Sequence, residues 1–110
     1  MWKVRAAAAG ARVPGFTPCE LAGMETFNGY DVSESNGPAA EDADVVAALR
    51  KAGAVVFGKS NVPAGTMDVQ TFNDKFGVTV NPYDVENQTT AGGSSGGSSS
   101  ALAAGMYVRC

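Results

Sequence analysis

The sequence predicts an α/β fold with a parallel sheet, and three observations support that class. The first is a helical pattern that begins at Asp42 or Asp44 and ends at Gly53. The second is a continuously apolar run, residues 54–57, which follows the helix at once and is typical of a strand buried on both faces. The third is a hydrophobic content of 45% with 17% charged residues, the balance of a globular chain. A helix that leads directly into such a strand favours a crossover between parallel strands.

The segment before the helix carries little regular pattern. Residues 1–20 begin with a run of alanines and then contain Pro14 and Pro18, so we expect this segment to be poorly ordered. Its apolar run is broken early by Gly10, which makes it a poor secretory signal, and no stretch is long enough to predict a transmembrane span. Residues 21–42 are rich in Gly, Asn, Ser and Pro and predict a long surface connection.

The helix is supported by its apolar spacing and by signals at both ends. An aspartate at 42 or 44 can cap its start, and glycine is a common terminator. Basic residues in its last turn favour the negative end of the helix dipole. The apolar residues at helical spacing are Val45, Val46, Leu49 and Ala52.

Beyond the strand, short elements alternate with loops. Residues 63–70 indicate a short helix or turn, and residues 76–80 indicate another extended segment. A polar loop leads into the Gly/Ser run, residues 91–100, which we expect to open the last helix. That helix is predicted from Ser98 to about residue 108, with Ser98 as its cap.

Charge and composition exclude several functional classes. The net charge is −3 and the eight basic residues are scattered, so no nucleic-acid-binding surface is expected. The chain has no histidine, which excludes a Ser-His-Asp triad and histidine-ligated metal sites. Cys19 and Cys110 are far apart and do not form a zinc site. We expect two free thiols in a reducing compartment, with the cytoplasm favoured.

Three interpretations of the Gly/Ser run remain open on composition alone. It can be a flexible linker, an anion-binding nest at a helix start, or a catalytic loop whose hydroxyls pass protons. The linker interpretation is weakened because an apolar helical segment follows immediately. A phosphate-binding loop of the Walker type is not indicated, because the run contains no lysine.

The Gly/Ser run also carries a family resemblance. Residues 92–98, Gly-Gly-Ser-Ser-Gly-Gly-Ser, precede a small-residue helix that ends in Ala-Gly-Met, and this resembles the core motif of the amidase signature family. Three upstream blocks agree with the family in order and spacing, namely residues 44–54, 58–61 and 76–84. The resemblance begins near residue 21 and covers roughly residues 20–106, so we expect residues 21–110 to form part of an amidase-signature domain.

The resemblance implies a fold, a reaction and a set of site residues. The fold is an α/β/α core around a mixed sheet, here incomplete at both ends. The reaction is hydrolysis of a carboxamide C–N bond in a small-molecule substrate, without a metal or organic cofactor, by a lysine, a bridging serine and a nucleophilic serine. Motif position makes Ser94 the bridging serine, which the family holds on a cis peptide, here Gly93–Ser94. Gly93, Ser95 and Met67 are the predicted substrate contacts, although loop hydrogen bonding is an alternative role for Ser95.

Two catalytic groups of the family do not match this sequence. The family's nucleophile lies in a second Gly-Gly-Ser block downstream, whereas this chain continues only as residues 107–110. The family's lysine falls by spacing near Phe16 or Thr17, and Lys59 belongs to a different block and is expected to be structural or solvent-facing. We therefore expect a fragment that shows no amidase turnover by itself. The alternative is a non-catalytic module that binds an anion or a partner, and an exposed sheet edge predicts self-association.

Overall fold

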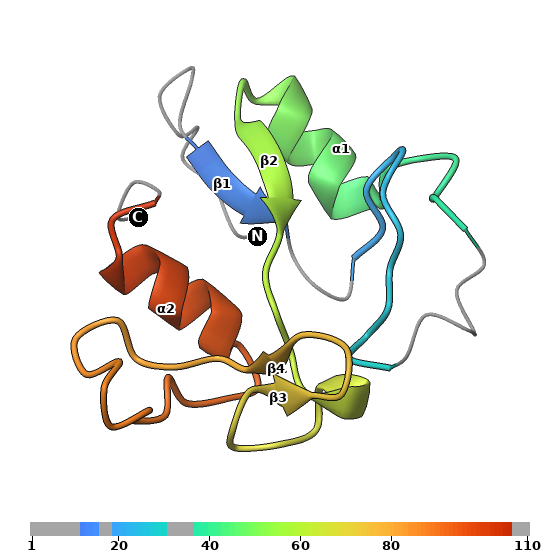
Figure 1. The fold of residues 1–110 in the computed structure, drawn as a ribbon. Helices are drawn as coiled ribbons and strands as arrows, with labels where there is room; N and C mark the ends of the chain where they lie inside the picture. The colour runs from blue at the N-terminus through green and yellow to red at the C-terminus, as the bar shows by residue number, and fades with distance from the viewer. Residues whose placement is uncertain (1–11, 16–18, 31–36, 107–110) are drawn as a thin grey trace.

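The computed structural model describes residues 12–15, 19–30 and 37–106, and within them the chain forms two small sheets and two α-helices (Figure 1). Strands β1 and β2 form a parallel pair, and β3 and β4 form an antiparallel pair. The elements in chain order are β1 (Arg12–Gly15), α1 (Asp44–Lys51), β2 (Val55–Lys59), the 3-10 turn η2 (Ala64–Thr66), β3 (Phe72–Asn73), β4 (Gly77–Val78) and α2 (Gly96–Ala103).

The first sheet confirms the predicted crossover. Helix α1 lies between β1 and β2 in the chain and contacts β2, and Figure 1 shows it alongside this sheet. Arg12 is in register with Val55 and Gly15 with Lys59, with an irregularity between them. Strand β1 belongs to the segment 1–20, for which the sequence predicted little order; residues 1–11 and 16–18 of that segment lie outside the described residues.

Helix α1 ends as its sequence predicted, but it begins without an aspartate cap. Gly53 has a φ of +89°, and its N–H donates to the Arg50 carbonyl at 2.9 Å while the Ala54 N–H donates to the Leu49 carbonyl at 3.0 Å. This is the Schellman arrangement that a left-handed glycine permits. The N-cap residue is Ala43, because Asp42 instead accepts from the Ala22 N–H and pairs with Arg50 at 2.8 Å.

Strand β2 differs from its prediction in burial. Val55 and Phe57 are each 48% exposed, whereas a strand buried on both faces was expected. The apolar run was sufficient to predict a strand. Helix α1 packs on this two-stranded sheet, however, so only one face of the sheet is well covered. Among the described residues the buried apolar core is small and consists of Leu21, Val46, Ala54 and Val62.

The second half of the chain is built mainly from turns. The turn η2 and strand β4 lie where short elements were predicted, and the Thr79 N–H donates to the Thr71 carbonyl at 2.9 Å beside the β3–β4 pair. Helix α2 begins at Gly96, two residues before its predicted start, so Ser98 lies inside the helix and is not its cap. None of the described helices has the length and apolarity to cross a membrane.

Candidate functional site

The predicted bridging serine lies in a tight loop at the start of α2. The peptide bond between Gly93 and Ser94 is cis, the isomer that the resemblance implied. Ser94 is half-buried, whereas Ser95 is exposed and is the N-cap residue of α2. The Ser95 carbonyl accepts from the backbone N–H and the hydroxyl of Ser99, at 3.0 and 3.3 Å. The Gly/Ser run is therefore a structured helix entry and not a flexible linker.

The hydroxyl of Thr71 holds this loop from inside the molecule. Thr71 is fully buried, and its Oγ1 accepts from the Gly96 N–H at 2.9 Å. The same oxygen lies 3.0 Å from the Gly92 carbonyl and 3.3 Å from the Ser94 carbonyl, to which its proton can be donated. The Thr71 N–H also donates to the Gly92 carbonyl at 3.1 Å. One threonine thus contacts the loop on both sides of the Gly93–Ser94 bond.

Close backbone approach explains why glycines flank the serines. A Cβ atom on Gly93 would lie 2.6 Å from the Asp68 carbonyl oxygen, and one on Gly96 would lie 2.4 Å from Thr71 Oγ1. A Cβ on Gly97 would lie 2.3 Å from the Asn61 backbone nitrogen. These distances are shorter than atomic contacts permit, so the loop can pack against residues 61 and 68–71 only with glycine at these positions.

Asparagines connect the other blocks of the resemblance to this loop. The Asn61 carbonyl accepts from the Gly97 N–H at 3.2 Å, and its side-chain Nδ2 donates to Thr79 Oγ1 at 2.9 Å. Asn73, only 3% exposed, donates through Nδ2 to Asn61 Oδ1 at 2.6 Å and to the Val62 carbonyl at 2.8 Å. Ser60 and Ser98 share a hydroxyl hydrogen bond of 2.8 Å. The end of β2, the β3–β4 turn and the start of α2 are thereby fixed together.

The predicted substrate contacts occupy two neighbouring segments. Gly93 and Ser95 flank Ser94 in the loop, and the Asp68 carbonyl next to Met67 faces Gly93. Met67 itself is 88% exposed and borders a pocket of about 210 Å³, together with Tyr30 and Phe72. The sequence did not point to Thr71 or Asn73, because neither belongs to a motif that the resemblance used.

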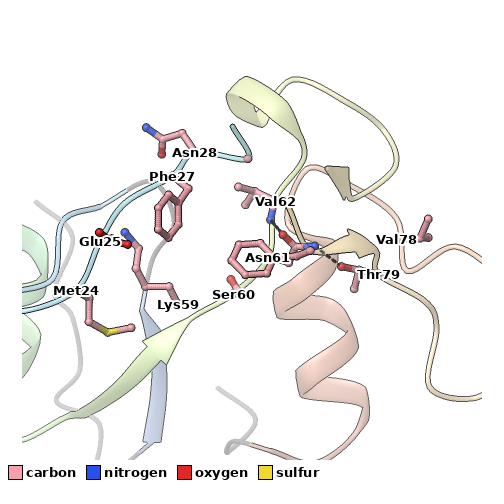
Figure 2. A pocket seen from close by; sticks show the side chains of 12 residues that line it. Met24, Glu25, Phe27, Asn28, Lys59, Ser60, Asn61, Val62, Val78 and Thr79 are labelled. Atoms are coloured by element: carbon pink, nitrogen blue, oxygen red, sulfur yellow. Dashed lines mark hydrogen bonds between the residues drawn. The ribbon is translucent and has the colours of Figure 1, made fainter. Parts of the chain in front are cut away.

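A larger pocket of about 500 Å³ lies at the end of β2 (Figure 2). Lys59 rises from this strand end toward the segment that carries Glu25 and Phe27, and its Nζ donates to the hydroxyl of Thr26. Burial lowers the pKa of Lys59 below its ordinary value, against the opposing effect of Cys19 and Glu20. The pocket's lining among the described residues comes from segments 24–29, 59–62, 76 and 78–79, and so does not include Ser94.

The described residues offer no cluster suited to a metal ion and contain one free cysteine. Across residues 12–15, 19–30 and 37–106, no group of three or more His, Cys, Asp or Glu side chains is arranged to hold a metal ion. Cys19 is a free thiol, and Cys110 lies outside the described residues. The described contacts place a threonine hydroxyl, Thr71 Oγ1, next to the Ser94 carbonyl.

Comparison with known proteins decides the family. A model of the amidase family matches residues 18–109. The chain belongs to the amidase family. This amidase chain is 48% identical over 88 residues to the putative amidase AmiB2 of Mycobacterium tuberculosis, which covers 79% of the chain and 18% of that protein. It is 44% identical over 84 residues to the indoleacetamide hydrolase of Bradyrhizobium diazoefficiens, covering 76% of the chain and 16% of that protein.

Solved structures agree with this assignment. The fold of the amidase chain matches a glutamyl-tRNA(Gln) amidotransferase subunit of Thermotoga maritima with a TM-score of 0.79 and 35% identity. That match covers 97% of this chain and 24% of the other. The partial α/β fold is thereby confirmed, and the chain spans less than a fifth of the length of the two curated relatives above.

Proposed function

We propose that this chain supplies Ser94 as the bridging hydroxyl of a Ser-cisSer-Lys relay, in an enzyme that hydrolyses the C–N bond of small carboxamides. Membership of the amidase family supports the reaction class. The observation that carries the finer proposal is the loop itself, in which Ser94 is held against the buried Thr71 at the start of α2. No metal or organic cofactor is part of the proposal.

In the proposed relay, Ser94 moves protons and forms no covalent bond to substrate. A neutral lysine takes the Ser94 hydroxyl proton as Ser94 takes the proton of the nucleophilic serine, whose oxygen attacks the amide carbonyl. Backbone N–H groups stabilise the resulting oxyanion. The C–N bond then breaks, the proton returns through Ser94 to the leaving nitrogen, and water releases the carboxylate from the acyl-enzyme by the same route.

We further propose that the 110 residues by themselves do not complete this cycle. The sequence contains one Gly-Gly-Ser-Ser-Gly-Gly block, and the place of the relay lysine falls near Phe16 or Thr17. Lys59 lines a pocket whose described lining does not include Ser94. We expect the purified chain to release no ammonia from small carboxamides above the level of its Ser94→Ala variant. Turnover that Ser94→Ala abolishes would overturn this part of the proposal.

The role of Ser94 is testable in a chimera. Residues 20–106 replace the matching segment of the indoleacetamide hydrolase, which keeps that enzyme's own residues on both sides of the graft. The chimera should hydrolyse indoleacetamide, and Ser94→Ala should reduce its kcat by about 100-fold or more, as loss of a proton-transfer group does. Ser99→Ala is the matched control, since Ser99 is an exposed serine of the same run whose hydroxyl donates to the Ser95 carbonyl.

Each outcome of the chimera experiment is informative. An active chimera in which Ser94→Ala and Ser99→Ala lose the same small fraction of kcat would contradict the relay role. A folded but inactive chimera would contradict the claim that this segment is functionally equivalent to that of the relative. Circular dichroism and thermal unfolding separate this second result from a failure to fold.

A further inference from the structure

Thr71 and the Gly/Ser loop form one connected unit. The backbone N–H of Thr71 donates to the Gly92 carbonyl, and its carbonyl accepts from the Thr79 N–H, at 3.1 and 2.9 Å. These bonds fix the Thr71 backbone between the β3–β4 turn and the loop. Its side chain then has a single hydroxyl within hydrogen-bond reach of three loop groups, contributed by Gly92, Ser94 and Gly96.

The Thr71 hydroxyl has one hydrogen-bond partner that donates to it and two that can accept its proton. It accepts one bond, from the Gly96 N–H, and its single proton can be donated to either the Gly92 or the Ser94 carbonyl. Gly96 is buried, and its N–H is in the first turn of α2, where the helix supplies no carbonyl partner. Thr71 therefore performs from outside the helix the capping that the Ser95 side chain does not perform.

The Thr71 hydroxyl is tightly enclosed by neighbouring atoms. Gly96 approaches so closely that its Cβ position would be 2.4 Å from Thr71 Oγ1 and 2.7 Å from Thr71 Cβ. Thr71 is fully buried, so its hydroxyl does not exchange these partners for water. A buried hydroxyl with such partners is costly to remove, because each polar group left behind is unsatisfied.

We infer that Thr71 is a positioning residue for Ser94, and that its hydroxyl sets the conformation of the loop and the start of α2. The inference rests on the proposed function of Ser94 and extends it to a residue that lies 23 positions away in the sequence. Thr71 does not take part in proton transfer to substrate, since its hydroxyl is enclosed and committed to the loop. Its contribution is to hold the backbone on which Ser94 is presented.

The experiment compares two near-isosteric changes in the 110-residue chain. Thr71→Val keeps the shape and removes the hydroxyl, whereas Thr71→Ser keeps the hydroxyl and removes the methyl group. Amide hydrogen exchange by NMR should be at least about fivefold faster at Gly96 in Thr71→Val, the loss expected for one hydrogen bond, and within about twofold of the parent in Thr71→Ser. The Ser94 amide and Cβ resonances should move in Thr71→Val and return in Thr71→Ser.

Controls separate anchoring of the loop from general stability. Amide exchange at Val46 and Ala47 in α1 should be unchanged in both variants. Thr89→Val should leave Gly96 and Ser94 unaffected, because the Thr89 hydroxyl donates to Asp84 and not to the Gly/Ser loop. Should Thr71→Val lose its helical circular dichroism, Thr71→Ala makes the same comparison without burying an added methyl group.

Two results would overturn the inference. One is unchanged Gly96 exchange and Ser94 resonances in the variant without the hydroxyl. The other is equal disturbance in Thr71→Ser and Thr71→Val, which would assign the effect to methyl packing. Neither readout depends on turnover, so this experiment fails separately from the chimera that tests Ser94.

Discussion

Buried polar side chains hold the candidate site together at the level of single residues. Thr71 and Asn73 are almost completely buried, and between them they bond the Gly/Ser loop, the end of β2 and the β3–β4 turn. Hydrogen bonds of this kind contribute modestly when made but are expensive to break inside a protein. The position of Ser94 therefore depends on polar contacts more than on the small apolar core.

The partly buried Lys59 leads to a prediction about how the free energy of unfolding depends on pH. Because burial lowers its pKa in the folded chain, the unfolded chain binds more protons between that lowered value and the ordinary value of about 10.5. The free energy of unfolding should therefore gain a contribution from Lys59 as pH rises through this window. Urea unfolding at several pH values should show a steeper rise for the parent chain than for Lys59→Met. Identical slopes would contradict the partly desolvated placement of the amine.

The residues that position Ser94 could not be found by sequence pattern alone. Thr71 bonds groups 21 to 25 residues away, and Asn73 bonds Asn61 across 12 residues. Local periodicity carries no information about partners at that separation. Ser94 was accessible through its Gly/Ser motif, and the family resemblance, now shown, supplied its predicted role.

Among the elements, the start of α2 shows why glycine is needed where helix propensity disfavours it. Gly96 and Gly97 form its first turn and are both buried. The prediction placed the helix start at Ser98 because it treated the Gly/Ser run as a loop and Ser98 as the helix cap. Glycine is in addition a poor helix former. Tertiary contact with Thr71 and Asn61 overrides that propensity, since a larger residue would collide with them.

Replacing a glycine at the start of α2 should destabilise the folded chain. Gly97→Ala places a Cβ within 2.5 Å of two backbone atoms of Asn61, which cannot move aside as a flexible side chain can. We expect the free energy of unfolding to fall by about 1–3 kcal/mol, as for other overpacked sites. Gly58→Ala is the control, because its Cβ position has no atom within 4 Å. Equal urea midpoints for the two variants would contradict the close approach.

The other elements were predictable to the extent that their signals are local. Helix α1 has helical spacing and a terminating glycine within ten residues, and both its type and its end were predicted correctly. The apolar run of β2 correctly predicted a strand. The burial of that strand depends on which elements cover each face of the sheet, and a local run does not specify them. Val55 and Phe57 are half-exposed for that reason.

At the scale of the whole molecule, the described residues carry much exposed apolar surface for their size. Four buried apolar residues form the core, whereas Met67, Val69 and Tyr83 are each more than three-quarters exposed. Extensive exposed apolar surface is typical of proteins that associate. The chain spans less than a fifth of the length of the two curated relatives named above.

Self-association through β2 stays a prediction. Light scattering after size exclusion should give a mass above that of the monomer at micromolar concentrations, because the half-exposed Val55 and Phe57 lie on a strand paired only with β1 in the described sheets. Phe57→Lys should shift the chain toward monomer, whereas Met67→Lys, at a more exposed apolar residue away from the sheet, should not. A monomeric parent chain would contradict the prediction.

The ratio of kcat for Ser94→Ala to kcat for Ser99→Ala in the indoleacetamide hydrolase chimera decides whether Ser94 is the relay hydroxyl. If Ser94 passes protons between lysine and nucleophile, this ratio is about 0.01 or lower, with the two variants equally folded. A ratio near one would show that the loop serine is structural and that the proposed relay is wrong.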